Sequence, residues 1–116
     1  MDTTTVSVRY LVNDVAASLA FYTQVFGFET TMSAGTAFAD IRRGNLRLLI
    51  SGPLSSAGRT LADGSTPGPG GWNRIHFIVE DIEAEITRLH DAGVALRNKP
   101  VRGPGGTQVL VEDPSG

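Results

Sequence analysis

Residues 6–27, which read VSVRYLVNDVAASLAFYTQVFG, decide the fold. Residues 6–12 alternate in polarity, and this pattern predicts a strand with Val8, Tyr10 and Val12 on one face. Asp14 is a good N-cap, and apolar residues follow at helical spacing up to Phe26. Gly27 stands where a glycine commonly ends a helix. The stretch therefore predicts a strand followed by an amphipathic helix.

The same pattern returns in the second half of the chain. A second strand is predicted over residues 73–79, a second N-cap at Asp81, and a second terminating glycine at Gly93. Asp14 and Asp81 differ by 67 positions, and the same offset relates four further apolar pairs: Val8 and Ile75, Tyr10 and Phe77, Val15 and Ile82, Leu19 and Ile86. We interpret the two halves as an internal repeat of one strand–helix unit.

Short strands separated by turn residues follow each helix. They are predicted at Glu29–Met32, Ala37–Arg42 and Leu46–Ile50 in the first half, and at Ala95–Asn98 and Gln108–Glu112 in the second. Residues 52–71 contain six glycines and three prolines, a composition that disfavours helix and strand. We therefore expect a single domain with one module at 6–52, a connection at 53–71 and a second module at 72–116.

The composition excludes several classes of protein. Hydrophobic residues make up 41% of the 116-residue chain and charged residues 19%, which is inconsistent with disorder. The net charge is −2, and the sequence contains no run of charged residues long enough to bind nucleic acid or an anionic membrane. The chain has no cysteine, so disulfides and thiolate sites are excluded. With no apolar segment of membrane length and no secretory signal, we expect a soluble, cytoplasmic protein.

Two motifs identify a family resemblance. The segment from Val12-Asn13-Asp14-Val15 to Phe21-Tyr22 and Gly27-Phe28, together with Glu112-Asp113-Pro114-Ser115-Gly116, resembles the vicinal oxygen chelate superfamily of glyoxalases, bleomycin-resistance proteins and extradiol dioxygenases. The resemblance implies an α+β fold in which two βαβββ modules form a curved mixed sheet around one cavity, often completed by a homodimer. The second module lacks its last strand in this chain, and we expect the native protein to continue past Gly116.

The resemblance also implies a divalent metal, held by His or Gln on each first strand and Glu on each last strand. Carried onto this chain, the positions fall on Ser7, Arg74 and near Leu49, and the fourth lies beyond Gly116. Serine is a poor ligand for such metals, leucine has no donor atom, and a guanidinium repels a cation. We therefore expect no metal and no cofactor.

Strand alternation predicts a ligand-binding face instead. Its candidate residues are Ser7, Arg9, Arg47, Trp72, Arg74 and His76. Arg9 and Arg74, if they point into a partly dry cavity, must be paired with a carboxylate or bind an anion. An internal network with Asp40, Glu112 or Asp113 is therefore the alternative to ligand binding. Trp72 either caps the core or offers a flat surface to a planar ligand. We expect His90 to be exposed.

Three functions remain open. The first is a metal-independent small-molecule binding protein of the glyoxalase/bleomycin-resistance type, with a planar or anionic ligand in the cavity. The second is a metal-dependent lyase or dioxygenase with ligands from the absent strand or a second chain. The third is an interaction module. The open edge of the incomplete second module favours a homodimer that forms near the sheet edges or the helix at 81–93.

Overall fold

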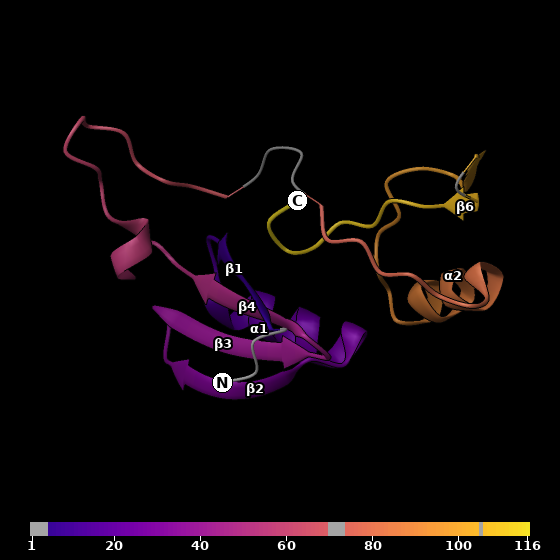
Figure 1. The fold of residues 1–116 in the computed structure, drawn as a ribbon, viewed down its shortest axis with the longest axis horizontal. Coiled ribbons are helices and arrows are strands. Elements are labelled where there is room, and N and C mark those ends of the chain that lie inside the picture. The colour runs from indigo at the N-terminus through magenta and orange to yellow at the C-terminus, as the bar shows by residue number, and fades with distance from the viewer. Residues whose placement is uncertain (1–4, 70–73, 105) are drawn as a thin grey trace. The chain divides into compact units, whose positions relative to one another are not determined.

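The fold is described from a computed structural model, which covers residues 5–69, 74–104 and 106–116 (Figure 1). The chain divides into two compact units. The first comprises residues up to Gly71 together with Ser115, and the second comprises residues 72–114 together with Gly116. Each unit is described by itself.

Helix α1 of the first unit spans Val15–Phe26, where the sequence predicts it. The Oδ1 atom of Asp14 accepts a hydrogen bond from the Ala17 amide at 3.0 Å, so one of the free amides of the first turn is satisfied. Gly27 adopts a φ of 68°, which an L-residue with a Cβ rarely tolerates, and the Phe28 amide donates to the Tyr22 carbonyl at 3.1 Å. Both predicted helix boundaries are confirmed.

Four strands form a curved mixed sheet in the order β1-β4-β3-β2 (Figure 1). Their bounds are Val6–Leu11 for β1, Glu29–Ala34 for β2, Phe38–Arg43 for β3 and Leu46–Ser51 for β4. Strand β1 pairs with β4 in parallel, and the remaining neighbours are antiparallel. The first unit thus has the predicted βαβββ order, and the α+β class is confirmed.

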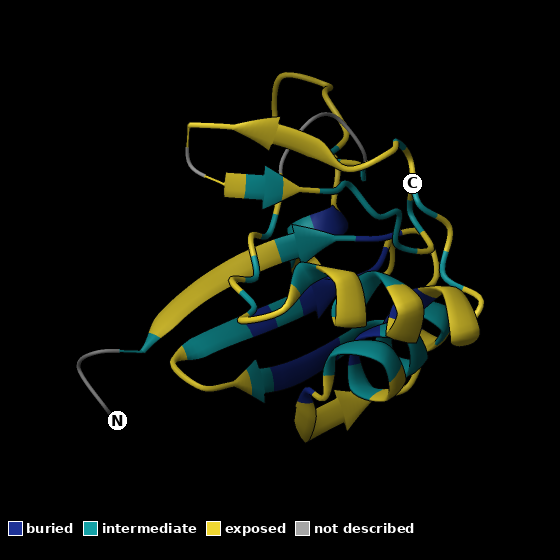
Figure 2. Ribbon diagram, turned by 90° about the vertical axis from the view of Figure 1, so that its right-hand side faces the viewer, coloured by how far each residue is buried: buried dark blue, intermediate teal, exposed yellow. Residues whose placement is uncertain are grey.

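The core lies between this sheet and helix α1, which packs over β3 and β4. Ala39, Ile41, Leu48 and Ile50 alternate along the two central strands and are fully buried. Figure 2 shows the buried segments of the sheet in dark blue. Each buried Leu or Ile contributes about 1.5–3 kcal/mol relative to an exposed one. Aromatic rings from the strand and the helix extend the core at its edge, where Tyr10 and Tyr22 meet edge to face at 6.1 Å.

The described part of the connection folds locally. A 3₁₀ turn, η1, spans Ser56–Gly58, and the Ser55 hydroxyl donates to the Gly52 carbonyl at 2.7 Å and accepts from the Gly58 amide at 3.2 Å. Farther on, the Leu61 amide donates to the Ser65 carbonyl at 2.7 Å and closes a turn. The glycine- and proline-rich composition therefore gives tight turns in place of longer elements. The assignment of module boundaries stays a prediction.

The second unit contains helix α2, Ile82–Asp91, at its predicted place. Asp81 Oδ1 accepts from the Ala84 amide at 3.1 Å, the same cap that Asp14 gives helix α1. Strands β5, Val101–Gly103, and β6, Gly106–Gln108, form a separate antiparallel pair. No helix among the described residues is long and apolar enough to cross a membrane.

Three strands predicted for the second half differ from the structure. Residues 74–79 form no strand, and Asn73 lies outside the described residues. In the first unit the equivalent strand pairs with β4, whereas residues 74–79 pair with no strand among the described residues. A strand without a partner cannot satisfy its backbone groups within a sheet. The repeat therefore holds for the capped helices and not for the strands that precede them.

The predicted strands at Ala95–Asn98 and Gln108–Glu112 are replaced by an isolated bridge between Leu96 and Val111. Backbone hydrogen bonds from Arg97 to Leu110 and from Glu112 to Ala95 flank this bridge, and Gln108 belongs to β6. The Oδ1 atom of the Asn98 side chain accepts a hydrogen bond from the Leu110 amide at 2.8 Å. This side-chain bond replaces a backbone bond between the two segments. Pro100 adds no amide donor. Regular pairing therefore forms only next to the glycine-rich turn, in β5 and β6.

Candidate ligand-binding face of the first unit

The side of the four-stranded sheet that faces away from helix α1 is hereafter called the distal face. It carries several charged side chains of the first unit. Strand register places its residues in three rows that run from β1 to β2. The rows are Ser7-Arg47-Arg42-Glu29, Arg9-Leu49-Asp40-Met32 and Leu11-Ser51-Phe38-Ala34. Because side chains alternate between the faces of a strand, these residues lie opposite the buried core positions. The distal face thus combines charged groups with apolar ones.

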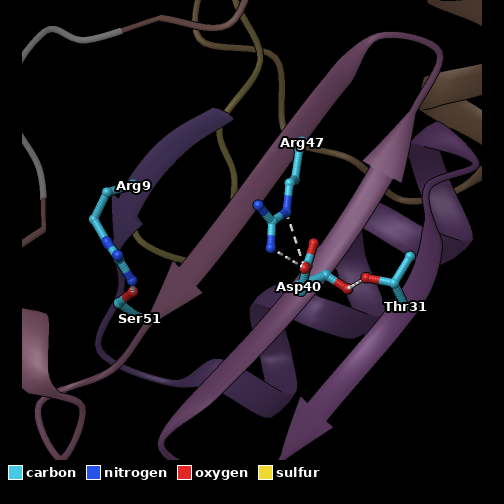
Figure 3. A network of polar contacts seen from close by, with 5 residues as sticks. All are labelled: Arg9, Thr31, Asp40, Arg47 and Ser51. Atoms are coloured by element: carbon cyan, nitrogen blue, oxygen red, sulfur yellow. Dashed lines mark hydrogen bonds and ion pairs between the residues drawn. The ribbon is translucent and has the colours of Figure 1, made fainter. Parts of the chain in front are cut away.

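One ion pair crosses the distal face from β4 to β3. Both Nε and Nη2 of Arg47 donate to Oδ2 of Asp40, at 2.9 and 2.6 Å (Figure 3). The Asp40 side chain is only 8% exposed and that of Arg47 is 24% exposed. The hydrogen bond from Arg47 lowers the pKa of Asp40, and the same bond raises the pKa of Arg47. Asp40 is therefore an ionised carboxylate at neutral pH.

The pair leaves two buried polar atoms unsatisfied. Within the described residues, neither Asp40 Oδ1 nor Arg42 Nε has a hydrogen-bond partner, although both are shielded from solvent. The two residues are adjacent on the distal face of β3, and the charge of Arg42 also acts on the Asp40 carboxylate. Such atoms are rare in folded proteins because their desolvation is not compensated.

A bulge in β2 positions the carbonyl of Asp40. The register shifts between Thr30 and Met32, so Thr31 has no backbone partner in the β2–β3 ladder. The Thr31 hydroxyl instead donates to the Asp40 carbonyl at 3.0 Å (Figure 3). The bulge thus holds the middle of β3 by a side-chain bond.

Arg9 is held more loosely than Arg47. Its Nη1 donates to the Ser51 hydroxyl at 3.4 Å, near the limit of a hydrogen bond (Figure 3). Ser51 in turn donates to the Leu49 carbonyl at 3.1 Å. Among the described residues, no carboxylate lies within ion-pair distance of Arg9 or Arg42. Two of the three guanidinium groups on this face therefore have no acidic partner there.

The structure gathers only part of the predicted ligand-binding set. Ser7, Arg9 and Arg47 share the distal face, with Ser7 directly opposite Arg47. Arg74 and His76 belong to the second unit, where both are exposed in a segment without regular structure. Trp72 lies outside the described residues. The binding role of all six residues stays a prediction.

Arg47 pairs internally with Asp40, one of the carboxylates named as possible partners, while the pairing of Arg9 and Arg74 that the sequence left open stays a prediction. Within the second unit Glu112 pairs with Arg97, with Nε and Oε1 at 2.9 Å. His90 is exposed, as predicted. Sequence reasoning missed Arg42, although the alternation of Phe38, Asp40 and Arg42 against buried neighbours contained the signal.

The residues at the family's metal positions do not fit a divalent cation. Leu49 has no donor atom, Arg74 carries a positive charge, and Ser7 offers one hydroxyl. Within residues 5–69, 74–104 and 106–116, no three His, Asp or Glu side chains group as a candidate ligand set. These three positions therefore lack the donor atoms of the family's metal site.

Fold and sequence together define a protein of the glyoxalase type. The family model "Glyoxalase/Bleomycin resistance protein/Dioxygenase superfamily" matches residues 4–116, and the chain belongs to this superfamily. A comparison with curated proteins gives no significant match.

Solved structures of the same fold include a lyase, a further member of the superfamily and an antibiotic-binding protein. Lactoylglutathione lyase from Agrobacterium tumefaciens is 23% identical with a TM-score of 0.77, and the alignment covers 100% of this chain and 90% of that one. A superfamily member from Sphaerobacter thermophilus DSM 20745 is 24% identical with a TM-score of 0.71, covering 97% and 90%. TnmS3, an antibiotic binding protein from Streptomyces sp. CB03234, is 20% identical with a TM-score of 0.71, covering 97% and 88%. At these identities the likeness establishes the fold alone.

Proposed function

We propose that the protein binds a small organic anion on the distal face without a metal ion. The observation that carries the proposal is the pair of arginines, Arg9 and Arg42, that have no acidic partner among the described residues. Arg42 is half-buried and its Nε is shielded from solvent, which is costly without a counter-charge, and an anionic ligand would remove that cost. Arg9 is exposed and adds a second positive charge to the same face. The cytoplasmic location expected from the sequence stays a prediction.

Apolar residues beside the arginines support a ligand with a hydrocarbon or ring portion. Leu11, Phe38 and Leu49 lie on the same face and are only half-buried. Small-molecule sites are commonly apolar surfaces with a few polar groups that fix orientation. The antibiotic-binding neighbour TnmS3 shows that this fold is used for binding in another protein.

A metal-dependent lyase is the second candidate, because lactoylglutathione lyase from Agrobacterium tumefaciens shares the fold. That function would require metal ligands from outside the described residues, since Ser7, Leu49 and Arg74 do not supply them. The metal content of purified protein, measured by mass spectrometry, separates the two candidates. Binding that is lost on chelation and restored by a stoichiometric divalent metal would support the enzyme.

The test of the first candidate is a titration with small planar carboxylates at low ionic strength. Arg9→Gln and Arg42→Gln each remove one charge-assisted hydrogen bond of about 1.5–3 kcal/mol, so we expect at least tenfold weaker binding. Arg59→Gln changes the same charge at an exposed position in the connection and serves as the control. Equal affinity in all variants would contradict binding at the distal face.

A further inference from the structure

Asp40 has hydrogen-bonding capacity that its ion pair does not use. Arg47 directs two N–H groups to Oδ2, and Oδ1 makes no hydrogen bond of normal distance and angle among the described residues, although the nearby Thr31 hydroxyl also lowers the pKa of Asp40. Of its neighbours on the distal face, Leu49, Met32 and Phe38 have no polar hydrogen, and Arg42 does not bond to Oδ1. A buried carboxylate oxygen without a hydrogen bond is a strong acceptor, and a hydrogen bond from a ligand would offset the cost of its desolvation.

Arg42 presents the complementary deficiency two residues along the same strand. Its Nε is a buried donor without an acceptor, and it does not bond to Asp40 Oδ1. The two atoms therefore do not satisfy each other, and no other described residue satisfies either. A molecule that carries a hydrogen-bond donor beside an acidic group would satisfy both.

Access to Oδ1 requires a side chain to move, because the atom has no contact with solvent. Met32 lies directly opposite Asp40, next to the bulge in β2, and is 53% exposed. Its unbranched thioether chain has three rotatable bonds and readily changes conformation. Access of a ligand to Oδ1 therefore requires a neighbouring side chain, such as that of Met32, to change its conformation.

We propose that Asp40 is a specificity-determining residue whose Oδ1 accepts a hydrogen bond from an N–H or O–H group of the ligand. Arg42, whose Nε lies on the same strand and face, binds the acidic group of the same molecule. The ligand class is thus an organic acid that carries a hydrogen-bond donor close to its carboxylate. This inference rests on the proposed function and narrows it.

Two isosteric pairs of probes test the donor. Pyrrole-2-carboxylate and furan-2-carboxylate have the same shape and charge, but the first has a ring N–H where the second has a ring oxygen, and the 3-carboxylates vary the spacing. We expect a pyrrole to bind at least tenfold more tightly than its furan, measured by calorimetry or ligand-observed NMR. A single hydrogen bond to a charged group has this effect. Equal binding of pyrrole and furan in both pairs would overturn the role of Asp40.

The variant Asp40→Asn assigns the preference to this residue. Arg47 would hold the remaining carbonyl oxygen, so the amide NH₂ would occupy the position of Oδ1 and present a donor in place of an acceptor. We expect the pyrrole preference to disappear in this variant, while Arg59→Gln retains it. A preference that survives in folded Asp40→Asn protein would overturn the proposal, and the wild-type comparison remains decisive if that variant does not fold.

The outcomes separate this inference from the function on which it rests. If both probes bind equally and Arg9→Gln weakens both, anion binding stands and the donor contact is wrong. If neither probe binds in either pair, the proposed binding of small planar acids fails, and the role of Asp40 fails with it.

Discussion

Arg47 on β4 directs Nε and Nη2 to one oxygen of Asp40 on β3, at 2.9 and 2.6 Å, and leaves the other carboxylate oxygen without a partner. The pair joins two strands at the centre of the sheet, on the face that helix α1 does not cover. It therefore combines a structural contact with an unused acceptor, and both consequences can be measured.

The ion pair makes the free energy of unfolding depend on pH. Because the folded-state pKa of Asp40 is lowered, chiefly by its hydrogen bond with Arg47, the stabilisation is present above the unfolded-state pKa and is lost as pH falls through the folded value. We expect Arg47→Gln to unfold at lower urea concentration than wild type at pH 7. The difference should shrink below about pH 4, where aspartate begins to protonate in the unfolded chain. A difference that stays constant down to pH 2 would contradict this account.

Ser18 offers a stabilising substitution. It lies in helix α1 facing the sheet and is fully buried, and its hydroxyl has no hydrogen-bond partner among the described residues. Ser18→Ala removes an uncompensated polar atom and improves helix propensity, so we expect a gain of about 1 kcal/mol in the free energy of unfolding. Urea denaturation measures it, with the exposed Ser33→Ala as a control that should change stability by less than about 0.5 kcal/mol. A loss of stability in Ser18→Ala would mean that the hydroxyl has a partner.

The helix caps show why much of the fold is predictable from sequence. Asp14 and Asp81 act on amides three residues away, and Gly27 acts through its own backbone, so a short stretch of sequence contains the whole interaction. The four strands of the first unit are predictable for a similar reason, since their alternation reflects one buried face. Strand pairing in the second unit is not local, and the segment at 74–79 has strand-like sequence without a partner strand.

The candidate site likewise has features that the sequence predicts and features that it does not. Period-two alternation places Ser7, Arg9 and Arg47 on one face, and the same reasoning could have included Arg42. The free oxygen of Asp40 was beyond the sequence, because it depends on Arg47 reaching diagonally between two strands whose register is set by the whole sheet.

The cap of helix α1 can be tested by substitution and rescue. Asp14→Ala removes the acceptor for the Ala17 amide, and we expect a loss of about 1 kcal/mol in the free energy of unfolding. Asp14→Ser keeps an oxygen in reach of the same amide and should recover most of that loss. Equal stabilities for the alanine and serine variants would show that charge or backbone effects dominate over the cap.

Close packing in the connection predicts a sharp contrast between two glycines. A Cβ on Gly58 would lie 2.5 Å from the Gly52 carbonyl oxygen, whereas one on Gly68 meets no atom within 4 Å. We expect Gly58→Ala to destabilise the protein by about 1–3 kcal/mol, the usual cost of overpacking. Gly68→Ala should be neutral or slightly stabilising. Thermal denaturation of the two variants side by side gives the answer, and similar midpoints would mean that the turn at η1 adjusts without strain.

Self-association is the last expectation that the fold allows to be tested. Strands β1 and β2 are the outer strands of the sheet, and on β1 the side chains of Val6 and Val8 are 55% and 38% exposed. An edge strand with apolar side chains favours pairing with another chain, and a symmetric dimer is the commonest result. We therefore predict a homodimer, with a mass by light scattering near twice the 12.3 kDa of one chain. Val8→Lys places a charge beside this edge and should shift the equilibrium toward monomer, whereas Gln24→Lys at an exposed position of helix α1 should not. A monomeric wild type at micromolar concentration, or equal effects of the two variants, would exclude association through β1.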